Sequence, residues 1–95
     1  MSISLVIGFT VKNDRLTSFK KIMTDVKINL PKVKGCKKVT IFNREENPLE
    51  FKLVEKWDSK ALHESHVEGL IASGQWNLLV EHLQEPPVSG YYSEI

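Results

Sequence analysis

Two different hydrophobic periods follow each other at the start of the chain, and their order constrains the fold most. The first is an alternation in which every second residue is apolar: Ile3, Leu5, Ile7, Phe9 and Val11. A period of two is that of a β-strand with one apolar face. The second is a stripe with apolar residues three or four positions apart: Leu16, Phe19, Met23, Val26 and Leu30. This stripe predicts an amphipathic helix, with Asp14 as N-cap and Pro31 at its end.

The rest of the chain shows the same two kinds of pattern, with a β-hairpin before the next helical segment. Gly35 opens a second strand, in which Val39 and Ile41 share one face and Thr40 and Phe42 the other. Residues 43–48 are polar and predict a loop, and the alternation over 49–57 predicts a third strand paired with the second. A short helix is expected from Lys60 to about Val67 after the cap residues Asp58 and Ser59. A second helix, begun by Ser73, carries Trp76, Leu79, Val80 and Leu83 and stops at Pro86-Pro87, and residues 88–95 form a last strand.

The resulting order, β-α-β-β-α-β, predicts an α+β, ferredoxin-like domain with a four-stranded antiparallel sheet and helices on one face. With 95 residues and no linker or repeat, residues 1–95 are expected to form one domain. The other face of the sheet needs a cover, and Val6, Val39 or Phe42, and Val54 can supply apolar area there. A second copy packed sheet to sheet is the simplest cover, so a homodimer is expected.

Composition narrows the class of function. The formal net charge is only +1, from 13 basic and 12 acidic residues, which predicts no binding to nucleic acid or to anionic membranes. The lysines between 32 and 38 are interpreted as a solvated surface. Cys36 is the only cysteine, so it is interpreted as a small buried hydrophobe. No stretch resembles a signal peptide or a membrane span, so a cytoplasmic protein is expected.

Residues 35–76 resemble the antibiotic biosynthesis monooxygenase family. The shared pattern is a Gly-Cys pair that opens a strand, a later strand that ends in Val-Glu-x-Trp, and a helix that carries a histidine. In this chain these features are Gly35-Cys36, Val54-Glu55-Lys56-Trp57 and His66, and Trp76 with Leu78-Leu79 fill the aromatic and leucine positions that follow. The chain departs from the pattern at Glu68-Gly69-Leu70-Ile71, which resembles an insertion beside the expected pocket.

The resemblance implies a dimeric α+β barrel that oxygenates a small aromatic, quinol or anthrone-type substrate with O₂, without metal or flavin. A deprotonated substrate of this kind supplies the electrons itself, so the protein needs an apolar pocket, a base and donors that stabilise the anion. The related haem-degrading enzymes carry an Asn on the first strand, which this chain lacks. Because one fold can serve several functions, the alternative is a non-catalytic dimeric small-molecule-binding or stress-related protein of the same fold.

The residues themselves suggest where such chemistry would lie. His66 shares a helix face with Leu62 and is the candidate base, with a structural histidine as the alternative. Glu55 is a second candidate for catalysis if its carboxyl points inward, and otherwise it is paired or exposed. The candidates for substrate contact are Trp57, Phe9, His63, Trp76 and Tyr91.

Each of these candidate contact residues also has a purely structural interpretation. The aromatic side chains are otherwise core, and His63 is otherwise solvated. His82 is expected on the surface. His63 and His66 are three residues apart, but nothing nearby completes a metal shell, so no metal is expected. The family resemblance implies no other cofactor.

Overall fold

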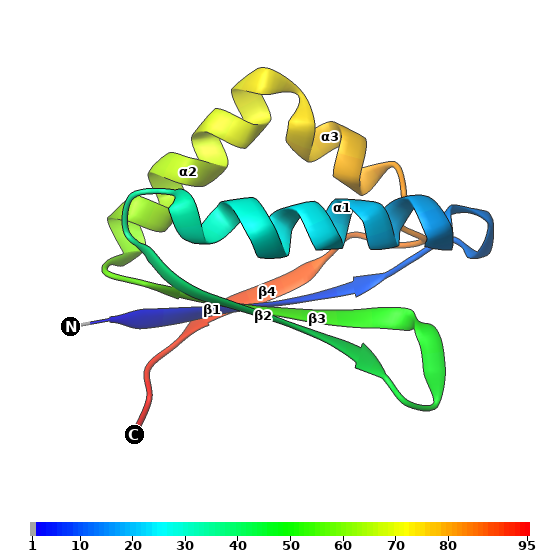
Figure 1. The fold of residues 1–95 in the computed structure, drawn as a ribbon, viewed down its shortest axis with the longest axis horizontal. Coiled ribbons are helices and arrows are strands. Elements are labelled where there is room, and N and C mark those ends of the chain that lie inside the picture. Colours follow the sequence, from blue (N-terminus) through cyan, green and yellow to red (C-terminus); the bar gives the residue numbers. More distant parts are fainter. Residues whose placement is uncertain (1) are drawn as a thin grey trace.

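The computed structural model describes residues 2–95 and has the expected element order (Figure 1). The strands are β1 (Ile3–Thr10), β2 (Cys36–Arg44), β3 (Asn47–Trp57) and β4 (Val88–Tyr92). The helices are α1 (Leu16–Asn29), α2 (Lys60–Ser73) and α3 (Gln75–Val80), with short 3₁₀ turns η1 (Asn13–Arg15) and η2 (Leu30–Lys32) at the two ends of α1.

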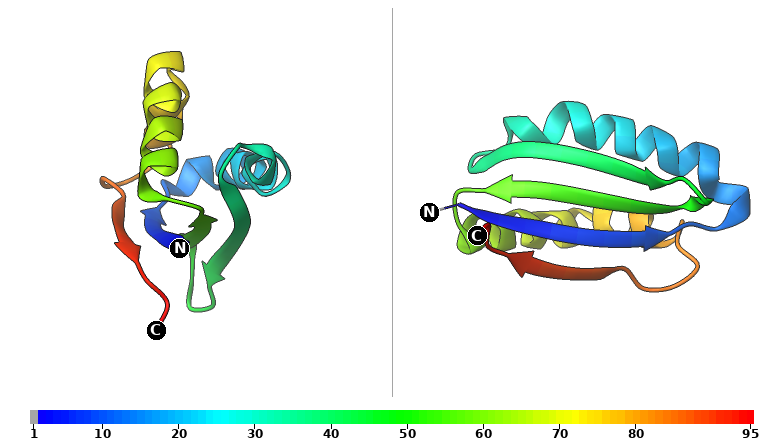
Figure 2. Two further views of the ribbon diagram at one scale, coloured as in Figure 1. Left: turned by 90° about the vertical axis from the view of Figure 1, so that its left-hand side faces the viewer. Right: turned by 90° about the horizontal axis from the view of Figure 1, so that it is seen from below.

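The four strands form one antiparallel sheet in the order β2-β3-β1-β4. All the helices lie on one face of it (Figures 1 and 2). This is the α+β, ferredoxin-like arrangement that the sequence predicts. The pairs Leu5↔Glu55 and Leu5↔Tyr91 place the centre of β1 between β3 and β4.

The core lies between α1 and the sheet. It consists of the alternating residues of β1 and the apolar stripe of α1, joined by inward side chains of β3: Leu5, Ile7, Phe9, Val11, Phe19, Met23, Phe51, Leu53 and Leu83. Phe19 stands edge-on to Phe9, with ring centroids 5.4 Å apart, which is a favourable aromatic geometry. A second cluster of Leu30, Cys36 and Trp57 closes the end where α2 begins.

Some element boundaries differ from the expectations. Asp14 is wrong as an N-cap, because it lies inside η1 and no side chain caps the start of α1. The β2–β3 hairpin is tighter than the predicted loop: only Glu45 and Glu46 lie between the strands. The last strand ends at Tyr92 rather than at residue 95.

The largest difference concerns α2, which continues beyond the predicted end near Val67 to Ser73. A glycine inside a helix costs only about 1 kcal/mol, so Gly69 does not end the helix. The left-handed backbone of Gly74, with φ of 85°, then ends α2 and also precedes α3. The segment Glu68-Gly69-Leu70-Ile71 therefore lengthens α2, and α3 ends at Val80, before Leu83 forms an isolated bridge with Val11.

The sheet face opposite the helices, here called the open face, carries several exposed apolar side chains. Register places Val6 opposite Val54 and Phe42 opposite Lys52 on this face, whereas Val39 packs towards the helices. Phe42, Val88 and Tyr92 are 55%, 78% and 58% exposed in the single chain. In residues 2–95, no helix has the length and apolarity needed to cross a membrane. The cytoplasmic location stays a prediction.

Candidate active site

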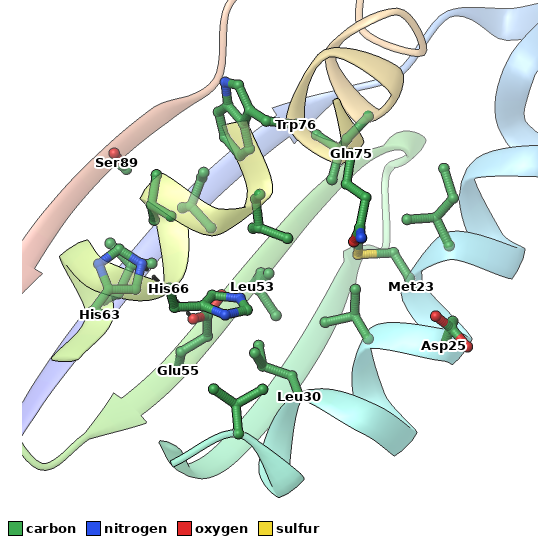
Figure 3. A pocket seen from close by; sticks show the side chains of 18 of the residues that line it. Met23, Asp25, Leu30, Leu53, Glu55, His63, His66, Gln75, Trp76 and Ser89 are labelled. Atoms are coloured by element: carbon green, nitrogen blue, oxygen red, sulfur yellow. Dashed lines mark ion pairs between the residues drawn. The ribbon is translucent and has the colours of Figure 1, made fainter. Parts of the chain in front are cut away.

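A cavity of about 1020 Å³ lies between the sheet and the helices. Its floor is the inward face of β1 and β3, including Leu5, Ile7 and Leu53, and its walls are α1, α2 and α3. Figure 3 shows the polar groups at one end of it: Glu55 on β3 and His63 and His66 on α2. Cavities of this size, mostly apolar with a few convergent polar groups, are the usual setting for small-molecule binding.

Glu55 is the buried carboxyl of this cluster. Because β3 alternates, Glu55 shares the inward face with Phe51, Leu53 and Trp57, and only 6% of its surface is exposed. The indole Nε1–H of Trp57 donates a hydrogen bond of 2.8 Å to its Oε1 atom. Burial raises the pKa of Glu55, and the Trp57 hydrogen bond opposes this only in part. The surroundings therefore favour the uncharged carboxylic acid.

His63 is buried beside Glu55. The alternative interpretation of the sequence, a solvated His63, is therefore wrong. Its exposed fraction is 7%. Its Nδ1 atom lies 2.6 Å from the hydroxyl of Tyr91, and its Nε2 atom lies 4.0 Å from Glu55 Oε1, beyond hydrogen-bond distance. Burial, followed by the neighbouring His66, lowers the pKa of His63. Burial thus favours the neutral forms of both Glu55 and His63 over an ion pair between them.

His66 is half-buried and lines the cavity one helical turn after His63. Its ring stacks obliquely on Trp57, with centroids 5.4 Å apart and an angle of 36° between the planes. Burial lowers its pKa below the ordinary 6.5, so the neutral imidazole dominates at neutral pH. A neutral imidazole at a cavity wall can accept a proton from a bound molecule.

Local sequence explains why both histidines face the cavity. The hydroxyl of Ser59 accepts a hydrogen bond from the Leu62 amide at 3.2 Å, which fixes the start of α2, as the sequence predicts. Asp58 does not cap the helix but pairs with Lys37 at 3.2 Å. Side chains three positions apart lie on one face of a helix, so His63 and His66 project together towards Trp57.

The other candidates for substrate contact fall into two groups. Phe9, Trp76 and Tyr91 line the cavity, as His63 does. Trp57 has no exposed surface, is hydrogen-bonded to Glu55, and its ring centroid lies 5.4 Å from that of each imidazole. This position suits a side chain that supports Glu55, His63 and His66 better than one that touches a ligand.

The expectation that His82 is a surface residue is wrong. His82 is only 4% exposed. Its ring bridges the start of α1 and the end of α3. Its Nε2 atom is 2.9 Å from Ser18 Oγ on α1, and its Nδ1 atom is 2.8 Å from the Leu78 carbonyl oxygen on α3. Ser18 also lines the cavity and was missed. A serine in a lysine-rich helix gives no sequence signal of a partner 64 positions away.

Cys36 is buried, as expected, and burial raises the pKa of its thiol. Across residues 2–95, no group of three or more His, Cys, Asp or Glu side chains is arranged to hold a metal ion.

Comparison with known proteins places the chain in a family. Residues 2–70 match the sequence profile described as antibiotic biosynthesis monooxygenase. No curated protein matches the chain.

Solved structures share the fold at low sequence identity. A conserved protein from Methanosarcina mazei Go1 has 20% identity and a TM-score of 0.87, with 100% of this chain and 94% of that chain covered. A protein of Nitrosomonas europaea assigned to the antibiotic biosynthesis monooxygenases has 17% identity and a TM-score of 0.87, covering 99% and 90%. A mutant of SnoaB, a cofactor-independent oxygenase from Streptomyces nogalater, has 11% identity and a TM-score of 0.82, covering 98% and 92%. Because the family profile spans most of its length, the chain belongs to the antibiotic biosynthesis monooxygenase family.

Proposed function

We propose that the protein is a cofactor-independent monooxygenase that acts on a small aromatic, quinol or anthrone-type substrate. The observation that carries this proposal is the cluster of Glu55, His63 and His66, whose pKa shifts favour uncharged forms, at one end of an apolar cavity. Membership of the monooxygenase family and the shared fold of a cofactor-independent oxygenase support it.

The proposed reaction begins with proton transfer to His66. The neutral imidazole takes a proton from the bound substrate, and the resulting anion is electron-rich enough to reduce O₂ directly. For an anthrone, the oxidised carbon loses two hydrogens: one atom of O₂ becomes the new carbonyl oxygen, and the other leaves as water. The substrate supplies all the electrons, so the protein contributes position, a base and a dry site.

Glu55 and Tyr91 have complementary roles in this proposal. A protonated Glu55 can donate a hydrogen bond to the developing anion, which a carboxylate would repel. Tyr91 and His63 hold each other through their 2.6 Å contact and define the cavity edge next to β4. Phe9, four residues along β1 from the Leu5 that pairs with Glu55, and Trp76 would contact the part of the substrate that extends along the cavity away from this cluster.

Oxygen uptake with a panel of quinols and anthrones tests the function. We expect substrate-dependent O₂ consumption, with one oxygen atom from ¹⁸O₂ in the product. Binding of these molecules without O₂ consumption would contradict the oxygenase proposal and favour the alternative, a non-catalytic dimeric small-molecule-binding or stress-related protein. The hydrogen bonds of Glu55 and His63 fit a binding protein as well as an oxygenase. Substrate turnover therefore decides between these two functions.

Turnover is expected to persist after dialysis against a metal chelator. In the proposed reaction the substrate anion reduces O₂, so no metal-bound intermediate is required. The measurement is the oxygen-uptake rate before and after chelation, with each divalent metal added back singly. Loss of the rate on chelation, with recovery by one particular metal, would overturn the cofactor-independent mechanism.

We further propose that the protein is a homodimer formed through the open face. Exposed apolar surface on a sheet favours association, and a two-fold dimer covers the same patch on both copies. Val6, Phe42 and Val54 lie on this face, and Phe42 is 55% exposed in the single chain.

Sedimentation tests the dimer and its interface together. At micromolar concentration we expect twice the chain mass of 10.9 kDa. Phe42→Glu should shift the protein towards monomer, because it places a charge on the apolar face. Ile71→Glu is the matched control, since Ile71 is 54% exposed but belongs to α2 on the opposite side of the sheet. A wild-type monomer, or equal effects of the two variants, would contradict the proposed interface.

A further inference from the structure

The pair formed by Ser18 and His82 has the geometry of an activated nucleophile. The Ser18 hydroxyl oxygen and His82 Nε2 are 2.9 Å apart, across a sequence separation of 64. The other ring nitrogen, Nδ1, lies 2.8 Å from the Leu78 carbonyl oxygen. A carbonyl oxygen can only accept, so Nδ1 carries the proton and a neutral ring presents an unprotonated Nε2 to the serine. The serine therefore donates to a base that a third group orients.

The two partners differ in exposure in the way such a reaction needs. His82 is 4% exposed, and its ring lies 6.3 Å from that of Phe19, so the imidazole is fixed and shielded from water. Ser18, by contrast, is exposed and lines the cavity. A substrate can thus reach the hydroxyl while the base stays in place.

The pair lies far from the proposed oxygenation site. Ser18 is in the first turn of α1, and the other end of α1 leads to Leu30, which packs with Trp57. Twelve residues of helix separate Ser18 from Leu30, or about 18 Å. Figure 1 shows the end of α3 descending to the start of α1, away from the start of α2. The two sites therefore occupy opposite ends of one cavity.

The surroundings indicate what kind of group would bind near Ser18. Ile22, one helical turn later, and Leu79 and Trp76 of α3 also line the cavity. Such walls suit an apolar acyl or aryl group.

We propose that Ser18 and His82 form a second reactive site, which cleaves esters of apolar acids. Ser18 Oγ attacks the ester carbonyl while its proton moves to His82 Nε2. The bond from the carbonyl carbon to the leaving alcohol then breaks, and the alcohol takes the proton from His82. Water hydrolyses the acyl-serine with the same base, which releases the acid and restores both side chains. No oxidant or reductant enters this sequence.

A fluorophosphonate probe with an alkyl chain tests the nucleophile, and 4-nitrophenyl butyrate tests turnover. We expect one phosphonyl group per chain, located on Ser18 by peptide mass spectrometry, and ester hydrolysis above the buffer rate. Ser18→Ala should abolish both. His82→Gln should slow ester hydrolysis by about 10²–10⁴-fold, the usual contribution of a positioned base.

Ser89→Ala is the matched control, because Ser89 is also an exposed serine that lines the cavity, but on β4. It should leave labelling and hydrolysis unchanged. Circular dichroism establishes that each variant is folded, and Ser18→Ala decides the question even if the buried His82 variant unfolds. Labelling that Ser18→Ala does not remove, or no labelling and no hydrolysis by the folded wild-type protein, would overturn the proposal.

Discussion

We expect His66→Ala to lower oxygen-dependent turnover by about 10²–10⁴-fold, the range in which a positioned general base contributes. His66 lines the cavity, and its ring rests against Trp57. Removing the imidazole takes the proton acceptor away from that position, so the substrate anion forms far less readily. The folded dimer should persist, because a half-buried side chain at a cavity edge fills little core volume.

The pH dependence of the wild-type rate gives a second measure of the same role. Burial lowers the pKa of His66 below 6.5, and the neutral imidazole is the proposed base. The rate should therefore be low in acid and rise with pH through an apparent pKa below that of free imidazole. In His66→Ala this rise should be lost from the residual rate.

Val67→Ala is a matched control for His66→Ala. Val67 is the next residue of α2, is half-buried and also lines the cavity, but it carries no titratable group. It should alter KM more than kcat and keep the acid limb of the pH profile. A folded His66→Ala protein with wild-type turnover would exclude His66 as the base, and a loss of stability without a change in turnover would show a structural histidine.

The order of the elements was predictable because it depends on short-range patterns. The alternation from Ile3 to Val11 and the stripe from Leu16 to Leu30 each fix a strand or a helix face within one segment. The end of α2 was not predictable in the same way. Gly69 and Gly74 are both glycines near the end of the helix, and only the left-handed backbone of Gly74, which the sequence does not record, shows which of them ends it.

Only those parts of the candidate site that lie within one strand or one helical turn were predictable from the sequence. Spacing alone puts Glu55 with Trp57 on β3 and His63 with His66 on α2. The contact of His63 with Tyr91 and that of His82 with Ser18 join residues 28 and 64 positions apart. Such contacts depend on how the helices pack on the sheet, so the burial of His63 and His82 had no signal in local sequence.

Trp57→Ala is expected to cost about 3–5 kcal/mol of the free energy of unfolding, the range for removing a large buried aromatic side chain. Trp57 has no exposed surface and packs with Leu30 and Cys36 at one end of the sheet. The variant also deprives the buried Glu55 of its hydrogen-bond donor. Urea denaturation at a fixed protein concentration measures the loss, since association also changes apparent stability. Trp76→Ala is the control, because Trp76 is only half-buried and its removal should cost less.

Trp57→Phe separates the two contributions of this side chain. Phenylalanine keeps an aromatic ring in the cluster but has no N–H, so Glu55 Oε1 loses its 2.8 Å hydrogen bond. That bond lowers the pKa of Glu55 against the effect of burial, so the pKa should rise further in the variant. A carboxyl with a raised pKa in the folded state binds more protons there than in the unfolded state. Stability therefore falls as pH rises from the unfolded pKa to the folded one, and in Trp57→Phe the fall should continue to higher pH. Infrared titration of the Glu55 carboxyl measures this shift. An unchanged Glu55 pKa would mean that the indole contributes only its volume, and then Trp57 would not set the protonation state of the proposed site.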